Sequence, residues 1–315
     1  MTKKKPLFIL VGPTAVGKTS TSINLAKQLN GEIISADSMQ IYKYMDIGTA
    51  KVTDEEKQGI KHYLVDEIFP NEKFSAADFQ KRANKYISQI LVKDKMPIVV
   101  GGTGLYVNSL VYDLDFTKAI SNNELRKKFE SEASRYGNDY VMEKLKEVDL
   151  KSAKRIHIND TKRIIRALEV YHETGKPMSE SYNNFRKPNP LYDIAFVGLY
   201  MDRKKLYDRI NYRVDKMIEE GLIDEVKNLI NMGYDKDLAS MQGLGYKEII
   251  NWLDGKYDFE EAIRILKRDS RRFAKRQLTW FRRDNRIKWF DVEKCSDKKD
   301  LSKNIANYVR KKLNY

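Results

Sequence analysis

A phosphate-binding loop near the start of the chain constrains the fold more than any other sequence feature. Residues 12–19, GPTAVGKT, satisfy the pattern G-x-x-x-x-G-K-[ST]. An apolar run at 7–11 precedes the loop, and a segment with helical spacing at 18–29 follows it. A loop in this context turns backbone N–H groups toward an anion at the head of a helix. We therefore expect a di- or triphosphate at the carboxyl end of the first strand.

Each residue type in this loop has an expected task. Lys18 supplies a mobile cation, and the hydroxyl of Thr19 is a ligand for Mg²⁺. The other members curl the backbone around the phosphates; they are Gly12, Pro13, Thr14, Ala15, Val16 and Gly17. The loop alone does not tell which molecule carries the phosphates.

Short apolar runs alternate with longer segments of helical periodicity, which predicts an α/β fold, a P-loop NTPase-like core with a parallel sheet covered on both faces. Strands are expected at 7–11, 32–37, 62–68, 96–102, 194–201 and 287–292. Helices are expected at 18–29, 75–93, 203–219, 221–232 and 259–284.

One stretch interrupts this alternation. Residues 115–190 are charged, helix-prone and nearly free of strand patterns. We therefore expect two parts: a core formed by 1–114 and 191–315, and an all-helical insertion domain at 115–190.

The charge balance points to a polyanionic partner. Lys and Arg number 59 against 45 Asp and Glu, giving a formal net charge of +14. Such a surplus suggests nucleic acid, and a basic surface without a partner is the alternative. The densest basic stretch is 268–290, where Arg276 and other cations share one side of a helix and are expected to contact phosphates. In the expected insertion, 151–172 is also basic, with one packed face and one free to grip a nucleic-acid backbone. A solvated helix face is the alternative for both.

The remaining composition places limits on the type of protein. Cys295 is the single cysteine, so an internal disulfide is impossible and a reducing compartment is expected. No apolar run approaches the ~20 residues of a membrane span. Only three histidines occur, which argues against a metal site built from protein side chains alone. We expect a cytoplasmic protein and, in the absence of a heptad pattern, a monomer.

A carboxylate follows the second expected strand. Asp37 comes directly after IISA, whereas the strand at 96–102 leads into GGTG without an acidic residue. Many P-loop NTPases place an Mg²⁺-holding Asp at the end of a second strand. Asp37 instead suits a group that faces an acceptor beside the phosphates, with a turn cap as the alternative. Arg213 lies one helical turn from Arg209, so both could reach one anion, unless they pair with neighbouring acidic residues.

Six motifs in a fixed order carry a resemblance over about residues 12 to 283. They are GPTAVGKT, ISADSMQIYKYMDIGTAK, GGTGLY, NDTKRIIRALEVY, MQGLGYKE and RQLTWFR. Together they resemble the tRNA dimethylallyltransferase (tRNA isopentenyltransferase) family in its short bacterial form. The resemblance implies transfer of a dimethylallyl group from dimethylallyl diphosphate to N6 of an adenosine. That adenosine lies 3′-adjacent to the anticodon in tRNAs that read codons starting with U. The implied fold is a P-loop core with a helical insertion that helps hold the anticodon stem-loop.

The resemblance also implies roles for single residues. Asp37 matches a general base, and Thr14 to Thr19 would cradle the diphosphate, with Lys18 and Thr19-bound Mg²⁺ stabilising it as it leaves. Arg213 matches a diphosphate-binding arginine. Contacts with tRNA are implied for Asp37, Ser38, Met39, Gln40, Thr103, Arg126, Lys162, Arg163, Ile164, Ile165, Arg166, Gln242 and Lys247.

Two other classes of protein share parts of this pattern. A nucleotide or small-molecule kinase has the same loop and core but needs ATP turnover. A non-catalytic RNA-binding protein could retain the loop as a structural element. Neither accounts for all six motifs in order.

Overall fold

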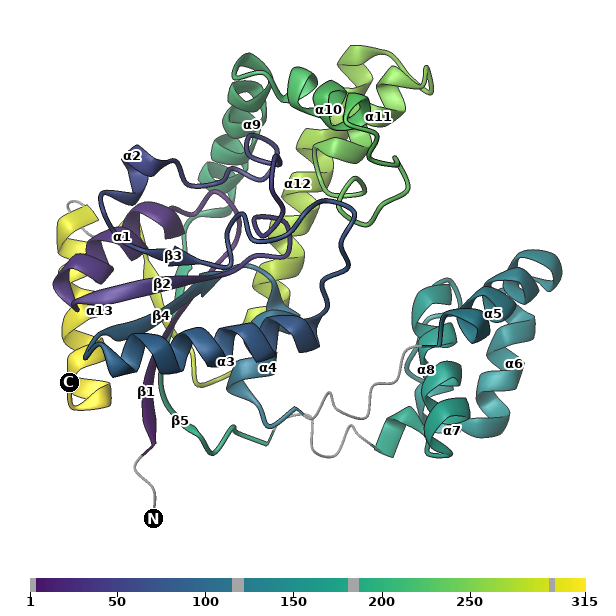
Figure 1. Cartoon of the computed structure of the whole chain (residues 1–315), viewed down its shortest axis with the longest axis horizontal. Helices are drawn as coiled ribbons and strands as arrows, with labels where there is room; N and C mark the ends of the chain where they lie inside the picture. Colours follow the sequence, from purple (N-terminus) through teal and green to yellow (C-terminus); the bar gives the residue numbers. More distant parts are fainter. Residues whose placement is uncertain (1–3, 115–121, 181–186, 295–297) are drawn as a thin grey trace. The chain divides into compact units, whose positions relative to one another are not determined.

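A parallel β-sheet forms the centre of the larger part of the protein (Figure 1). The computed structural model describes residues 4–114, 122–180, 187–294 and 298–315. Within these residues the sheet has six strands in the order β3-β2-β4-β1-β5-β6, and every neighbouring pair is parallel. The strands are β1 (Lys5–Val11), β2 (Gly31–Ala36), β3 (His62–Tyr63), β4 (Met96–Gly101), β5 (Tyr192–Tyr200) and β6 (Lys288–Asp291).

The interior strands form where the sequence carries short runs of apolar residues. β1 lies between β4 and β5, with Phe8 opposite Ile98 on one side and Ala195 on the other. All three side chains are fully buried. Parallel strands covered on both faces lose alternation and become unbroken apolar runs, which is why the sequence located them. The predicted parallel α/β core is confirmed.

Helices connect these strands and cover the sheet. They are α1 (Lys18–Gln28), α2 (Asp54–Lys57), α3 (Ala76–Val92), α4 (Gly104–Val111), α9 (Arg203–Glu219), α10 (Leu222–Asn231), α11 (Tyr246–Leu253), α12 (Phe259–Phe281) and α13 (Lys298–Leu313). Several begin at a capping side chain: Ser75 and Asp78 form a capping box at α3, and Asp202 and Asp258 cap α9 and α12. The main apolar cluster includes buried residues of the sheet and of α1, α9, α12 and α13.

The predicted strand at 62–68 is wrong over most of its length. Only His62 and Tyr63 pair with β2. Leu64 and Asp66 then adopt φ values of 60° and 57°, in the left-handed region that a strand cannot contain. Apolar residues in this segment therefore serve the core from a loop, which periodicity does not distinguish from a short buried strand.

A second compact unit comprises Tyr112–Asn189, and the first comprises Met1–Val111 with Pro190–Tyr315. The described part of the second unit is helical, with α5 (Asn123–Tyr136), α6 (Asn138–Val148), α7 (Leu150–Ala153) and α8 (Thr161–Thr174). It has an apolar cluster of its own, which includes Phe129, Leu145 and Leu168.

Some sequence-based expectations fall outside the described residues, namely Cys295 and two segments of the expected insertion, 115–121 and 181–186. Among the helices in the described ranges, none is long and apolar enough to cross a membrane.

Candidate functional site

The phosphate-binding loop joins the end of β1 to the start of α1. Gly17 is the residue before the helix and has φ 96°, a left-handed conformation that glycine adopts without a side-chain clash. Ala15 is also left-handed, with φ 63°. Left-handed residues within such a loop turn successive N–H groups to one side, which creates a concave anion site. The local conformation agrees with the task expected from the sequence.

Lys18 is folded back onto its own loop. Its Nζ donates hydrogen bonds to the carbonyl oxygens of Gly12 at 2.9 Å and Pro13 at 2.8 Å. Burial lowers the pKa of Lys18 to about 8; the carboxylate of Asp37 opposes this change and the charge of Arg213 adds to it. A bound phosphate chain would offer this ammonium group a charged acceptor in place of two neutral carbonyls.

Arg213 reaches the same loop from α9. Its Nη1 lies 3.3 Å from the Thr14 hydroxyl, and burial is the main cause that lowers its pKa. Asp37 and Glu56 oppose that shift through their charges. Two cations from distant parts of the chain thus face one point. Their mutual repulsion is unfavourable, and a bound anion would offset it.

Asp37 stands just beyond the end of β2 and is held by a local turn. Its Oδ1 accepts a hydrogen bond from the Met39 N–H at 2.9 Å. The Ser38 N–H donates to Thr103 Oγ1 at 3.0 Å, which ties this turn to the GGTG segment after β4. The carboxyl ends of β1, β2 and β4 therefore bring the three motifs together.

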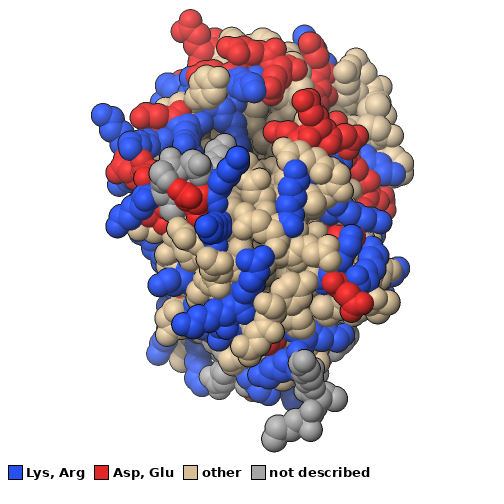
Figure 2. Space-filling view, turned by 90° about the vertical axis from the view of Figure 1, so that its left-hand side faces the viewer, with Lys and Arg blue, Asp and Glu red and all other residues tan. Residues whose placement is uncertain are grey.

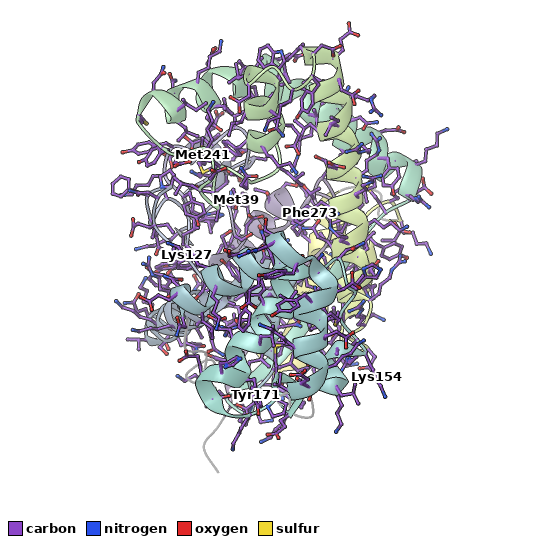
Figure 3. All side chains as sticks on the ribbon, turned by 90° about the vertical axis from the view of Figure 1, so that its right-hand side faces the viewer. Met39, Lys127, Lys154, Tyr171, Met241 and Phe273 are labelled. Carbon is purple, nitrogen blue, oxygen red and sulfur yellow. The ribbon has the colours of Figure 1, made fainter. Side chains whose placement is uncertain are left out.

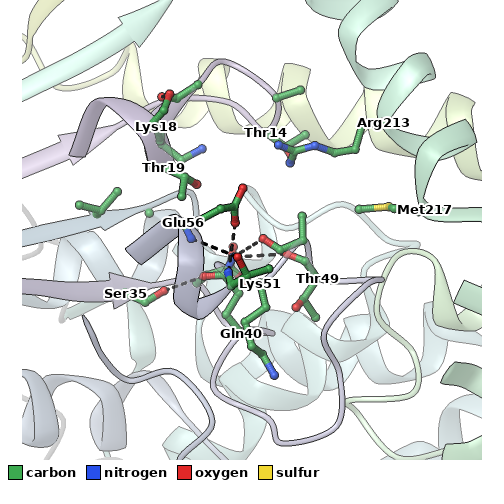
Figure 4. Close-up of a pocket in the computed structure, with 18 of the residues that line it drawn as sticks. Thr14, Lys18, Thr19, Ser35, Gln40, Thr49, Lys51, Glu56, Arg213 and Met217 are labelled. Carbon is green, nitrogen blue, oxygen red and sulfur yellow. Dashed lines mark hydrogen bonds between the residues drawn. The ribbon is translucent and has the colours of Figure 1, made fainter. Parts of the chain in front are cut away.

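These groups line one pocket of about 830 Å³ (Figure 4). Lys18, Thr14 and Arg213 lie along one side, and Gln40, Thr49 and Lys51 lie across from them. Asp37 and Thr19 also line the pocket. The volume is of the size that small-molecule sites have in proteins.

Gln277 of α12 is a pocket residue that sequence reasoning did not single out. Its Oε1 accepts from the Thr14 N–H at 2.9 Å, and its Nε2 donates to the Gly102 carbonyl at 3.1 Å. A Cβ on Gly102 would stand 2.1 Å from Gln277 Nε2, so a side chain at this position would displace the amide of Gln277. The motif RQLTWFR contains Gln277, but the charge pattern of this segment indicated a role only for its basic residues.

The other predicted tRNA contacts of the first unit differ in what their side chains do. The amide of Gln40 is engaged internally, with Ser35, Thr49 and Ala50. Met39 packs against Gly243, where an added Cβ would stand 2.3 Å from Met39 Cε.

Three further candidates of this unit lie outside the pocket lining. Gln242 is exposed and donates to the Lys236 carbonyl at 2.8 Å, while Lys247 Nζ is 3.8 Å from Glu248. Arg276 is exposed, with its guanidinium 5.7 Å from the ring centre of Phe273.

The predicted tRNA residues of the second unit divide into surface and interior positions. Arg126 and Arg166 both pair with Glu169, a carboxylate with no exposed area. Ile164 and Ile165 are 0% and 4% exposed and belong to the apolar cluster, so their side chains are covered and direct contact is no longer proposed for them.

The residues of this unit that remain available for contact with tRNA are exposed Lys and Arg side chains. Lys162 and Arg163 are exposed, and the guanidinium of Arg163 is 3.3 Å from Asp160. Lys127 and Lys154, labelled in Figure 3, are exposed as well.

Positive charge is also widespread elsewhere. Figure 2 shows Lys and Arg scattered over most of one face, with many Asp and Glu at its top and others toward its sides. The positive charge on this face is thus spread out rather than confined to one patch. A nucleic-acid contact has to be assigned to individual exposed cations.

Among the residues that the structure describes, no group of three or more His, Cys, Asp or Glu side chains could hold a metal ion. The pocket does bring the Thr19 hydroxyl to the lining that it shares with Lys18 and Arg213. Oxygen donors of this kind suit Mg²⁺, which keeps several waters and binds through one or two protein groups plus phosphates. The residues present therefore fit Mg²⁺ that arrives with a phosphate chain.

Comparisons with known proteins give concordant results. A family model described as IPP transferase matches residues 40–284. The chain is 59% identical over 308 residues to a tRNA dimethylallyltransferase of Alkaliphilus oremlandii, covering 98% of this chain and 97% of that protein. It is 55% identical over 303 residues to one of Acetivibrio thermocellus, covering 96% and 97%.

Solved structures are similar over most of the chain. The tRNA isopentenylpyrophosphate transferase of Bacillus halodurans has a TM-score of 0.73 at 46% identity, covering 99% of each chain. A eukaryotic dimethylallyltransferase, studied acting on tRNA, has a TM-score of 0.79 at 31% identity, covering 91% of this chain and 74% of that one.

Proposed function

We propose, because this chain belongs to the IPP transferase family, that it transfers a dimethylallyl group from dimethylallyl diphosphate to N6 of an adenosine in tRNA. The chain is an enzyme, a prenyltransferase. The adenosine would lie 3′-adjacent to the anticodon in tRNAs that read codons starting with U. One observation carries the finer proposal: Lys18, Arg213 and Asp37 share one pocket.

The cations of the pocket act on the leaving group. As the C–O bond of the donor breaks, diphosphate departs with its electron pair, and the allylic cation is delocalised. Lys18, Arg213 and the N–H groups of the loop face this growing charge, and preorganised donors stabilise such a transition state. Mg²⁺, held by Thr19 and diphosphate oxygens, would supply further neutralisation of the leaving group.

Asp37 acts on the acceptor. The amino group of adenine is a weak nucleophile because its lone pair is delocalised into the ring. As the new N–C bond forms, the N6 proton passes to the carboxylate of Asp37, which the Met39 N–H holds in place. A base inside stacked RNA cannot reach the pocket, so we propose that the adenosine is extruded from the anticodon loop.

Exposed cations supply the contacts with the rest of the tRNA. Lys162 and Arg163 project from the second unit, and Arg276 projects from the first. Contacts of this kind position a nucleic acid through its phosphates, whereas sequence is read in unpaired loops.

The test supplies radiolabelled dimethylallyl diphosphate, ATP and undermodified tRNA together. Label transfer to tRNA supports the proposal. ATP-dependent phosphorylation would instead identify a kinase, and binding without turnover would identify a non-catalytic RNA-binding protein.

Replacing Asp37 separates chemistry from binding. Asp37→Ala should lower turnover by roughly 10²- to 10⁴-fold, the usual contribution of a general base, with little change in tRNA affinity. The control is Asp208→Ala, at an exposed position of α9. Single-turnover kinetics and tRNA binding are measured in parallel, and equal losses in both would make Asp37 a binding or structural residue.

A further inference from the structure

One carboxylate of α10 holds a turn that begins 179 residues earlier in the chain. Glu225 Oε2 accepts from the Asp46 N–H at 2.9 Å and from the Ile47 N–H at 2.7 Å. Its Oε1 accepts from the Gly48 N–H at 3.1 Å and from the Tyr246 hydroxyl at 2.6 Å. Charge-assisted hydrogen bonds of this type are about twice as strong as neutral ones. No short-range sequence pattern requires this arrangement.

The turn held in this way forms part of the pocket wall. Residues 46, 47 and 49–51 line the pocket, and Thr49 and Lys51 lie across it from Lys18 and Arg213. Lys51 secures the side chain of Asp46 at 2.5 Å and also donates to the Tyr42 carbonyl at 2.8 Å. Asp46 is thus fixed through its backbone by Glu225 and through its side chain by Lys51.

The contact between the turn and α11 is close enough to need glycine. A Cβ on Gly48 would stand 2.6 Å from the ring of Tyr246, which is fully buried. The missing side chain lets the backbone N–H groups approach Glu225. The motifs DIGTAK and MQGLGYKE are therefore partners in one packing arrangement.

The wall is also connected to the segment that carries Asp37. Gln40 Nε2 donates to the carbonyl oxygens of Thr49 and Ala50 at 3.3 and 3.2 Å. Its Oε1 accepts from the Ser35 hydroxyl at 3.1 Å, at the end of β2. A continuous chain of hydrogen bonds and backbone thus runs from the 46–48 turn to the carboxyl end of β2.

We propose that Glu225 is a positioning residue, which fixes the 46–51 wall so that the pocket is preorganised for the prenyl donor. The inference rests on the proposed function, because it names the donor as occupant. Glu225 touches no reacting atom in this account. It acts by accepting hydrogen bonds from three backbone N–H groups of the wall. Without these hydrogen bonds the wall could move away from Lys18 and Arg213.

The experiment compares Glu225→Gln, Glu225→Asp and the wild type. The Gln variant keeps the size but presents an N–H₂ group to N–H donors, so the wall loosens. We expect amide hydrogens in a peptide covering 46–48 to exchange at least about tenfold faster, and the KM for dimethylallyl diphosphate to rise about tenfold, which is the size of one charged hydrogen bond. The kcat should fall by less than about threefold. Glu225→Asp, which keeps the charge on a shorter arm, should be intermediate in both.

The matched control is Asp224→Asn, which removes an equal charge from an exposed position of the same helix. It should change neither the exchange nor the KM. Unchanged exchange at 46–48 in Glu225→Gln would overturn the proposal. The proposal would also be overturned if kcat fell together with the free energy of unfolding measured in urea. Glu225 would then be a purely structural residue. If the wild type transfers no dimethylallyl group, the proposed function is wrong and hydrogen exchange, which needs no substrate, alone decides the role of Glu225.

Discussion

Glu32 offers a sharp test of how this fold uses charge away from the pocket. The side chain is 4% exposed and lies on β2. It accepts hydrogen bonds from Lys95 at 2.9 Å, Tyr63 at 2.7 Å and Lys93 at 3.0 Å. Burial alone would raise the pKa of Glu32, but the bonds from Lys95, Tyr63 and Lys93 outweigh it and lower this pKa from 4.5 to about 2.

The shift sets the expected magnitude. A difference of about 2.5 pKa units corresponds to roughly 3 kcal/mol of stability at neutral pH. The side chains of Lys93 and Lys95 are 42% and 37% exposed, so solvent screens them and the realistic contribution is about 2 kcal/mol. Because the folded pKa lies below the unfolded value, this contribution is complete above about pH 4.5 and is lost as the pH falls toward 2. At pH 3.5 roughly 40% of it is gone.

Urea unfolding of Glu32→Gln and the wild type at pH 7 and pH 3.5 measures both quantities. We expect the variant to be less stable by about 2 kcal/mol at pH 7, with a smaller difference at pH 3.5. Glu219→Gln, at an exposed position near the end of α9, is the control and should be neutral at both pH values. A loss at pH 7 no larger than that of the control, or one that does not shrink at pH 3.5, would refute the reasoning.

Two further predictions concern the tRNA contact and the sheet. Replacing Lys162 and Arg163 together by Gln should weaken tRNA binding and lower the slope of log K against log salt by about 1.4. The same double change at Lys311 and Lys312, exposed in the last turn of α13, is the control, and an unchanged slope in the Lys162 and Arg163 variant would remove these two residues from the interface. Gly101→Ala should destabilise the protein by about 3 kcal/mol or more, because a Cβ there would stand 2.1 Å from a backbone oxygen of β2. In thermal unfolding, the melting temperature should fall far more in Gly101→Ala than in Gly59→Ala. A Cβ at position 59 meets nothing within 4 Å, and only the φ of 79° disfavours alanine there.

The sequence predicted the parts of this protein that depend on local pattern. Strands β1, β2, β4 and β5 were found because interior parallel strands consist mostly of apolar residues. The predicted strand at 62–68 was too long because hydropathy does not reveal the left-handed conformation of Leu64 and Asp66. Composition does not separate the two cases either, because the short strand β3 and the loop that follows it both contain buried apolar residues.

The candidate site shows the same division between local and distant information. Asp37 follows β2 directly, and Lys18 follows β1 through the phosphate-binding loop, so their place at one edge of the sheet was inferable from the sequence. Glu225 and Gln277 bind groups 177 to 179 and 263 residues away. Neither belongs to a spacing rule, and only the tertiary fold brings Gln277 to the pocket and Glu225 to the turn that lines it. Arg126 was assigned to tRNA by motif, whereas its ion pair with the buried Glu169 depends on how α5 meets α8.

The position of β1 in the sheet has a consequence for how the protein is made. This strand is translated before both of its neighbours, β4 and β5, yet Phe8 needs Ile98 and Ala195 beside it. Long-range parallel pairing is slow, because the entropy of closing the loop is lost before the contacts form. The intervening unit moderates that loss if it folds on its own, since a folded unit shortens the effective loop. A ribosome-bound chain therefore displays its phosphate-binding loop long before α9 emerges with Arg213, and the pocket is complete only after α9 and α12 have followed.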